Sequence, residues 1–414
     1  MRSCEVMQQT SLPVSTSKSC LTIIQTLINQ VSSIMLRYLS ITLTIACTAL
    51  SAHAQPAVLD TDLVDLDVMV VTDGLEALWG FTFLPDGDIL ATERPGRLRI
   101  IRNGTLLNEP ISGVPEVFAR GQGGLLDVVL HPDFESNQFV YLSYAKPMDD
   151  NSTTAVARGR LQGMALVDVE DIFVADTRGR GHYGSRLVFD NDGYLFVTVG
   201  DRQANPNEDQ ANHPAQDRGN HHGTVNRLHD DGSIPSDNPF LGQEGVEPSI
   251  WSYGHRNPQG MVYDSVSGQL WINEHGPQGG DELNLVKPSL NYGWPIVGYG
   301  VNYGGKTLHD GTHQDGMEQP VHYWVPSIAT SGMVLYTGTL IEAWMGNLLV
   351  GGLGGQQIAR LTMDGTEVVS EETIFSGNGR VRDIRQGPDG AIYIGIDGTV
   401  DSAAIVRIAP TGSK

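Results

Sequence analysis

One short pattern recurs six times between residues 84 and 397: a turn rich in Asp, Asn, Pro and Gly precedes a strand-like run of alternating apolar residues. Each copy has the chemistry of a hairpin, because its turn residues tolerate a positive φ and its later residues alternate with period two. Six copies predict six similar units of β-sheet. The copies are LPDGDILATE at 84–93, HPDFESNQFVYLSYA at 131–145, DNDGYLFVTVGD at 190–201, DSVSGQLWINEHG at 264–276, WMGNLLVGGL at 344–353 and GPDGAIYIGID at 387–397.

Repetition of this kind predicts an all-β fold, a six-bladed β-propeller of four-stranded antiparallel sheets. The 49 glycines and 21 prolines suit many strands joined by tight turns. The copies are about 45 residues apart in places and about 60 to 80 apart in the middle of the chain. We therefore expect insertions at 202–245 and 291–330 that shape a rim around a substrate site. An irregular pair of β-sandwiches is the alternative that the repeat disfavours.

Residues 1–54 differ in character from the rest and are predicted to take no part in the fold. From Met35 the chain has a basic residue, an apolar stretch and an Ala-x-Ala signal that ends at Ala54, which is typical of a secretory signal peptide. We therefore expect Met35 to be the true start, cleavage to follow Ala54, and residues 55–414 to form one periplasmic or secreted propeller domain. A lipoprotein modified at Cys47 is the alternative.

The cysteine and charge distributions exclude several functions. All three cysteines lie within residues 1–54, so the predicted mature chain has no disulfide, no thiolate nucleophile and no Cys-ligated metal. The net charge of the whole chain is -22, and because residues 1–54 carry a surplus of two positive charges, the remainder has a net charge of about -24. So acidic a chain is a poor partner for nucleic acid or an anionic membrane, and we expect a monomer or weak homodimer with no stable membrane insertion.

The stretch 253–282 concentrates charged and amide side chains between Gly and Pro residues. Such side chains are poor material for a core, so the stretch predicts a loop, a strand and a loop that present polar groups to a site. Arg256 is suited to an anionic organic ligand. Asp281, Glu282 and the carbonyls of the Gly276-Pro277 turn are suited to a hard cation. A solvated surface hairpin is the alternative.

Further polar residues follow strand-like segments at similar places relative to the repeat. A lone His in a Gly-rich loop is more often a surface residue than a base, and no one of these residues is specific. Together they comprise a base, a carboxylate, amide donors and three arginines, which is what loops that converge over a propeller channel would provide. The residues are Gln122, His182, Asp201, Arg256, Asn257, Arg380 and Arg382.

Four motifs in combination are specific: GQGGLLD at 121–127, GHRNPQG at 254–260, GPQGGDE at 276–282 and NYGWP at 291–295. With them the chain resembles the soluble quinoprotein sugar dehydrogenases of the glucose/sorbosone dehydrogenase family, and most of all the aldose sugar dehydrogenase branch. The resemblance runs from about residue 78 to 408. It implies oxidation of the anomeric hydroxyl of aldoses to lactones with pyrroloquinoline quinone (PQQ) and calcium, and transfer of electrons to an external quinone or small redox protein.

The resemblance also implies roles for individual residues. His182 would be the general base that takes the sugar hydroxyl proton, and Asp201 would orient its imidazole. Arg256 would polarise the quinone oxygen that gains negative charge, with Asn257 and Gln122 as further hydrogen-bond donors.

The resemblance implies that other residues bind the cofactor. Arg380 and Arg382 would clamp the PQQ carboxylates, and Tyr303 would pack near the cofactor. Many members of the family have a Lys that contacts the cofactor where this chain has Gly354, so one cationic contact is expected to be missing.

The calcium ligands implied by the resemblance come from the same polar stretch and the loop after it. The carbonyls of Gly276 and Pro277 would hold the calcium of the cofactor. A second, structural calcium would take Glu282, Asp281 and the carbonyl of Tyr292.

Two other classes of propeller protein remain as alternatives. A calcium-dependent, lactonase-like hydrolase has no reason to cluster Arg256, Arg380 and Arg382. A non-catalytic binding module need not retain both His182 and Asp201 beside a calcium turn.

Overall fold

The computed structural model of the chain describes residues 57–207, 209–399 and 402–413. The predicted signal peptide and all three cysteines lie outside these residues. Within the described ranges, no helix combines the length and the apolar character needed to cross a membrane. These ranges consist mainly of β-strands and loops. The short helical segments are α2 (Phe134–Asn137), η1 (Gln210–Asn212), η2 (Pro214–Gln216) and η3 (Glu342–Trp344).

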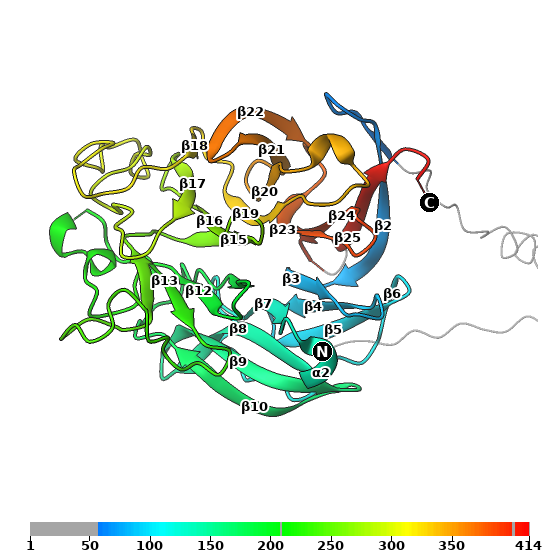
Figure 1. Cartoon of the computed structure of the whole chain (residues 1–414), viewed down its shortest axis with the longest axis horizontal. Helices are drawn as coiled ribbons and strands as arrows, with labels where there is room; N and C mark the ends of the chain where they lie inside the picture. Colours follow the sequence, from blue (N-terminus) through cyan, green and yellow to red (C-terminus); the bar gives the residue numbers. More distant parts are fainter. Residues whose placement is uncertain (1–56, 208, 400–401, 414) are drawn as a thin grey trace, which may run out of the picture. The chain divides into compact units, whose positions relative to one another are not determined.

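The strands form six antiparallel sheets, each of which we call a blade (Figure 1). Blade 1 contains β3 (Leu78–Phe83), β4 (Ile89–Glu93), β5 (Arg97–Arg102) and β6 (Thr105–Leu106). Blade 2 contains β7 (Leu125–Leu130), β8 (Phe139–Met148), β9 (Asn151–Gln162) and β10 (Ala165–Val174). Blade 3 contains β11 (Leu187–Phe189), β12 (Leu195–Val199), β13 (Thr224–Leu228) and β14 (Ile250–Tyr253).

The other three blades complete the ring. Blade 4 contains β15 (Pro258–Asp264), β16 (Gln269–Glu274), β17 (Asp281–Val286) and β18 (His322–Trp324). Blade 5 contains β19 (Thr330–Leu335), β20 (Leu348–Gly352), β21 (Gln357–Asp364) and β22 (Glu367–Ile374). Blade 6 contains β23 (Arg380–Gln386), β24 (Ile392–Asp397), β25 (Ala403–Pro410), β2 (Leu66–Leu75) and β1 (Ala57–Leu59). The first strand of each of blades 1 to 5, and β23 in blade 6, contacts its counterparts in both neighbouring blades, which confirms the predicted six-bladed β-propeller.

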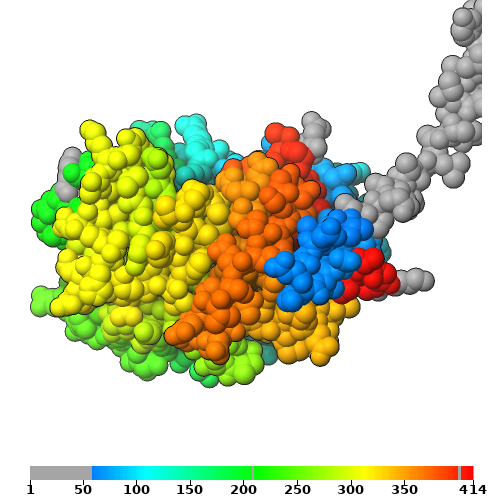
Figure 2. All heavy atoms as spheres, turned by 90° about the horizontal axis from the view of Figure 1, so that it is seen from above, coloured from blue at the N-terminus to red at the C-terminus, as the bar shows by residue number. Residues whose placement is uncertain are grey.

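Blade 6 joins the two ends of the propeller. Strand β2 pairs antiparallel with β25, with Val70 opposite Val406, so an early strand of the chain completes the sheet formed by its last three strands. In Figure 2 the blue segment that contains β1 and β2 lies beside the red segment at the other end of the chain. This pairing closes the ring without a covalent link. The pairing of β1 with β2 makes blade 6 five-stranded, one strand more than predicted.

Each of the six repeat copies connects the innermost strand of a blade to the second strand. In the first copy Gly87 has a φ of 90°, a conformation that favours glycine, and the Leu84 N–H donates to the Asp88 carbonyl at 2.8 Å. The alternation in the sequence predicts one buried face, whereas β4, β12 and β20 are buried at every position. These strands lie between neighbouring blades, so both of their faces are covered.

The two predicted insertions are present, but each range also includes residues of blade strands. Strand β13 (Thr224–Leu228) divides 202–245 into two loops, and 291–330 contains β18 and reaches the first residue of β19. The polar residues of β13 concealed it, because Asn226 and Arg227 are buried by hydrogen bonds and ring contacts rather than by apolar character.

Four charged side chains lie together among the innermost strands. Arg186 contacts Asp127 at 3.1 Å and Asp383 at 2.9 Å, and Arg385 contacts each of the two aspartates at 2.9 Å. The Phe81 and Leu187 N–H groups also donate to these carboxylates. We call Asp127, Arg186, Asp383 and Arg385 the axial ion cluster. Its two positive and two negative charges balance, which is the condition for burying ions at tolerable cost.

Candidate active site

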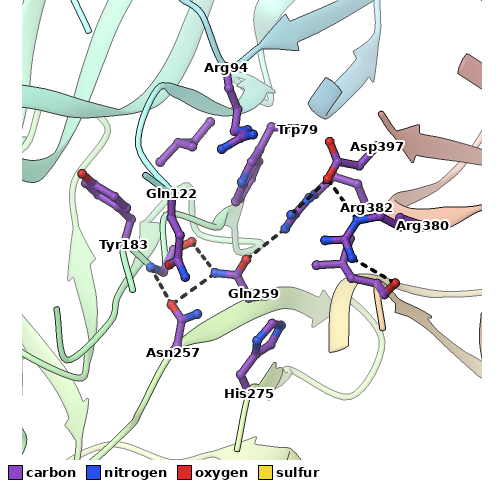
Figure 3. A pocket seen from close by; sticks show the side chains of 13 residues that line it. Trp79, Arg94, Gln122, Tyr183, Asn257, Gln259, His275, Arg380, Arg382 and Asp397 are labelled. Atoms are coloured by element: carbon purple, nitrogen blue, oxygen red, sulfur yellow. Dashed lines mark hydrogen bonds and ion pairs between the residues drawn. The ribbon is translucent and has the colours of Figure 1, made fainter. Parts of the chain in front are cut away.

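A cavity of about 220 Å³ lies next to the axial ion cluster, and all six blades contribute to its wall (Figure 3). The two are in contact, since Arg186 donates from Nε to the Gln259 carbonyl at 3.0 Å and lies over the ring of Trp79, 4.5 Å from its centroid. We call this space the main cavity. Its lining residues are Trp79, Arg94, Gln122, Leu126, Tyr183, Gly184, Asn257, Gln259, His275, Leu353, Arg380, Arg382 and Asp397.

The lining residues occupy equivalent places in the repeat. Arg94, His275 and Leu353 directly follow the second strands of blades 1, 4 and 5, and Asp397 ends that of blade 6. Others, such as Gln122 and Asn257, lie just before an innermost strand. The sequence patterns do not point to five of the lining residues, which are Trp79, Arg94, Gln259, His275 and Asp397. Arg94, His275 and Asp397 lie at or next to the end of a repeat copy, as Asp201 does, and this shared position is a signal that could have identified them.

His182 and Asp201 form a buried pair beside the main cavity. The imidazole Nδ1 lies 2.6 Å from Asp201 Oδ1. The other carboxylate oxygen accepts from the indole N–H of Trp294 at 2.8 Å, and the Gln203 N–H donates to Oδ1 at 2.9 Å. The His182 side chain is 9% exposed, and within the described residues the only hydrogen bond of its ring is the one from Nδ1, so Nε2 has no partner. Nε2 is therefore available to a substrate.

The electrostatics of the pair favour a neutral imidazole next to an ionised carboxylate. Burial lowers the pKa of His182, with Arg256 and Arg202 adding to the effect and Asp201 opposing it. Burial alone would raise the pKa of Asp201, but His182 and Arg256 outweigh it, so the pKa is below its usual value. A carboxylate can only accept, so Nδ1 carries the imidazole proton and Nε2 has the free lone pair.

Arg256 lies close to this pair. Its Nη1 donates to the His275 carbonyl at 3.1 Å, and its guanidinium lies over the Trp294 ring, 5.1 Å from the centroid. Trp294 therefore contacts both Arg256 and Asp201. The Arg256 N–H donates to Glu274 at 2.5 Å, which fixes the start of the loop.

The predicted amide donors hold the loop that carries His182. Gln122 Oε1 accepts from the His182 N–H at 2.7 Å, and Asn257 Oδ1 accepts from the Gly184 N–H at 3.2 Å. These bonds support His182 at a φ of 43°, which is costly for a residue other than glycine. Within the described part of the chain, the amide nitrogens of Gln122 and Asn257 have no partner, so they can donate into the main cavity.

Three guanidiniums line the main cavity, with one carboxylate among them (Figure 3). Asp397 lies 3.5 Å from Arg380 Nε and 3.7 Å from Arg382 Nη2. Burial lowers the pKa of Arg382 to about 10, and the like charges of Arg94, Arg380 and Arg186 add to the effect against Asp397. The cavity thus gathers positive charge that its own residues do not neutralise.

The predicted calcium residues line a second, smaller cavity of about 20 Å³, which shares His275 with the main cavity. Gly276, Pro277, Glu282 and Tyr292 all contribute to its wall. Within the described residues, no three His, Asp or Glu side chains gather as a metal site. A cation here would need backbone carbonyls, water or ligand atoms as well, which calcium accepts.

The carboxyl group of Glu282 in this smaller cavity has a raised pKa. Burial, followed by the nearby charge of Glu274, raises the pKa of Glu282 to about 8. Asn284 donates to both carboxylates, at 3.1 Å to Glu274 and 3.2 Å to Glu282. Two acidic groups with one shared amide would be stabilised by a cation.

Asp281 makes contacts of a different kind. Its oxygens accept from Ser327 Oγ at 2.8 Å, from the Gly276 N–H at 2.9 Å and from the Thr330 N–H at 3.3 Å. In this arrangement Asp281 holds the Gly276-Pro277 turn in place.

Besides His182, Asp201 and Arg256, which lie next to the main cavity but not in its wall, two other positions of interest lie outside that wall. Tyr303 is 70% exposed and lines neither of the two cavities, although the N–H of the next residue, Gly304, donates to Gln278 Oε1, next to the Gly276-Pro277 turn, at 3.2 Å. In blade 5 the lining residue is Leu353 rather than Gly354. A side chain at 354 would meet the Ala329 methyl at 3.3 Å from its Cβ.

The fold and the site together define a six-bladed propeller with a buried His-Asp pair beside an arginine-lined cavity. The sequence model described as Glucose / Sorbosone dehydrogenase matches residues 75–407. The chain belongs to this family of oxidoreductases.

Individual relatives agree with this assignment. The chain is 41% identical to aldose sugar dehydrogenase YliI of Escherichia coli over 354 residues, which cover 83% of this chain and 93% of that protein. The crystal structure of the soluble aldose sugar dehydrogenase from E. coli in its apo form matches with a TM-score of 0.78 and 41% identity, over 83% of this chain and 99% of that one. The PQQ-bound form of an aldose sugar dehydrogenase from Streptomyces coelicolor matches with a TM-score of 0.69 and 26% identity, over 83% and 98% of the two chains.

Proposed function

We propose that this protein oxidises the anomeric hydroxyl of aldose sugars to lactones with PQQ and calcium, and passes the electrons to an external quinone or small redox protein. The observation that carries the proposal is the buried His182–Asp201 pair next to a cavity with three converging guanidiniums. A base with a free Nε2 suits removal of a hydroxyl proton. An excess of cations in an acidic protein suits a cofactor with three carboxylates.

In this mechanism His182 takes the sugar hydroxyl proton at Nε2. Asp201 holds Nδ1–H and stabilises the imidazolium that forms. When bound, PQQ supplies the oxidant that accepts hydride from the anomeric carbon. Loss of the proton and of the hydride leaves a C=O bond, which makes the product a lactone. We assign to Arg256 the stabilisation of the negative charge that develops on the cofactor oxygen.

The residues of the main cavity fit PQQ. Arg380 and Arg382 can bind its carboxylates in the charge-assisted way that guanidinium favours, and the free amide nitrogens of Gln122 and Asn257 can donate to its oxygens. Trp79 offers an aromatic face in the same wall. We retain Tyr303 only as a rim residue near the calcium turn.

The smaller cavity fits calcium. We assign the carbonyls of Gly276 and Pro277 to the calcium of the cofactor, and Glu282 with the Tyr292 carbonyl to a second, structural calcium. Asp281 supports the first site through its bonds to the turn.

The test is dye-linked oxidation of a panel of aldoses by residues 55–414, with and without PQQ and calcium. We expect activity only when both are added, and we expect its loss in His182→Ala. A melting-temperature shift with calcium alone, together with lactone hydrolysis, would support a propeller hydrolase instead. Neither activity nor a shift with PQQ would support a non-catalytic binding module.

The same proposal places the mature protein in the periplasm or outside the cell, as a monomer or weak homodimer. Cleavage after Ala54 can be checked by N-terminal sequencing of the exported protein, and the oligomeric state by sedimentation.

A further inference from the structure

The guanidiniums that line the main cavity differ in their partners. Arg380 and Arg382 share the carboxylate of Asp397, at 3.5 Å and 3.7 Å. Arg94 has no carboxylate partner within the described residues, and its one hydrogen bond is from Nη1 to the Gly121 carbonyl at 3.1 Å. Its other donors are therefore open to a ligand.

Arg94 lies in a different part of the wall from the other two. It follows β4 in blade 1, whereas Arg380 and Arg382 belong to β23 in blade 6 (Figure 3). Its charge nevertheless reaches Arg382, whose pKa is lowered by burial and then by the repulsion of Arg94. Three like charges that converge on one cavity with a single carboxylate among them indicate a ligand with several negative charges.

Blade 5 contributes no cation to the same wall. Its lining residue is the apolar Leu353, and the position after it is Gly354, which lies outside the lining. A ligand with three carboxylates thus meets cations from blades 1 and 6 only, together with Arg256 at the neighbouring cavity.

We infer that Arg94 is a binding residue for a carboxylate of the cofactor, as a cationic contact from blade 1 in a wall to which blade 5 contributes only the apolar Leu353. The inference rests on the proposed function, because it concerns how the same cavity holds PQQ. The Nη1 bond to Gly121 fixes the guanidinium, and the remaining N–H groups donate to the carboxylate.

The experiment is a titration of PQQ, with calcium present, into the wild type, Arg94→Gln, Arg94→Lys and the control Arg120→Gln. Arg120 is an exposed arginine in the loop that carries Gln122, and it does not line the cavity. Binding is followed by quenching of tryptophan fluorescence, since Trp79 lines the cavity, and by the shift in melting temperature. These readouts need no sugar and no turnover.

We expect Arg94→Gln to raise the Kd for PQQ about tenfold or more, the usual effect of losing a charge-assisted hydrogen bond. Arg94→Lys should recover most of the affinity, and Arg120→Gln should match the wild type. Binding by Arg94→Gln within twofold of the wild type would overturn the inference. Equal weakening by Gln and Lys would also overturn it, because loss of the Gly121 anchor would then explain both. If the wild type itself does not bind PQQ, the proposed function fails as well.

Discussion

The main cavity and the axial ion cluster use the same chemistry in adjacent parts of the molecule, with opposite balance. In the cluster, Arg186 and Arg385 face Asp127 and Asp383, two cations against two anions. In the cavity, three guanidiniums lie with the single carboxylate of Asp397, which is close to Arg380 and Arg382 but is not paired with Arg94. Balanced buried charges are a structural element, whereas unbalanced ones indicate a missing ligand.

The arginine pKa values follow this difference. Burial lowers the pKa of Arg385, but Asp383 and Asp127 outweigh it, so the pKa of this guanidinium is raised. Burial also lowers the pKa of Arg382, and Asp397 offsets this only in part while Arg94 and the other neighbouring arginines add to it, so the pKa falls to about 10. Arg385 is therefore neutralised by its protein partners, whereas Arg382 keeps a repulsion from its neighbours that a bound anion would relieve.

The largest expected effect comes from removing one charge of the balanced axial ion cluster. Asp383→Ala leaves Arg186 and Arg385 under-compensated in the ring, and should lower the free energy of unfolding by about 3 to 5 kcal/mol. Urea denaturation of the apo protein measures this. The control is Asp389→Ala, which removes the ion-pair partner of Arg407. Because Asp389 is far more exposed than Asp383, its loss should lower the free energy of unfolding by at most about 1 kcal/mol. Equal costs would contradict the structural role of the cluster.

In the main cavity, loss of a charge should weaken ligand binding and leave the stability of the fold nearly unchanged. Arg380→Gln removes one of several like charges, so the apo protein should keep its unfolding free energy to within about 1 kcal/mol. The Kd for PQQ should rise about tenfold, because a charge-assisted hydrogen bond is lost. Arg385→Gln is the matched variant in the cluster and should destabilise the fold. A loss of stability in Arg380→Gln as large as that in Arg385→Gln would remove the distinction.

The smaller cavity offers a third, acidic case of unbalanced charge. The pKa of Glu282 is about 8 in the folded protein, above its ordinary value near 4.5, so folding favours the protonated form. The stability from this group is complete below pH 4.5 and is lost as the pH rises through 8. The melting temperature of the apo protein should therefore fall across this range.

Calcium and a substitution separate this effect from other titrations. Added calcium should reduce the fall in melting temperature with rising pH, since the cation favours the carboxylate. Without calcium, the melting temperature of Glu282→Gln should fall less over the same pH range than that of the wild type. An identical pH dependence in wild type and Glu282→Gln would show that another group is responsible.

The smallest expected effect concerns a single buried arginine near the base. Arg202 lies over the Tyr183 ring, 3.7 Å from the centroid, and its positive charge helps to lower the pKa of His182, after burial and Arg256. Arg202→Gln should shift the acid limb of the pH profile for sugar oxidation to higher pH by a fraction of a unit. A profile that keeps its midpoint while the maximal rate falls would indicate a purely structural role.

Much of the fold could be predicted because the repeat is local. A Gly turn such as that at Gly87 and the apolar run after it encode one hairpin, and six hairpins encode the blades. The extents of the insertions are less well predicted, because β13 is buried through two polar residues, Asn226 and Arg227. Their contacts include Val197, Ser249 and Tyr194, which are far from β13 in sequence.

The sequence points to part of the candidate site through combined motifs, because no single residue type there is specific. The family resemblance pairs His182 with Asp201, and in the structure the two are in hydrogen-bond contact. Arg94, Gln259 and Asp397 were missed, because each is an ordinary residue until the blades bring it to the cavity wall.

The amino-acid sequence by itself determined the number of blades, the turns between their strands and the set of polar loops, since these depend on contacts within short segments. Only the tertiary structure decided which charges are neutralised and which are open to a ligand. Arg186 and Asp383 are 197 residues apart in sequence yet 2.9 Å apart in space, while Arg94 has no carboxylate partner in the part of the chain that the structure describes. Electrostatic energy depends on distance and burial, and the closed ring sets both.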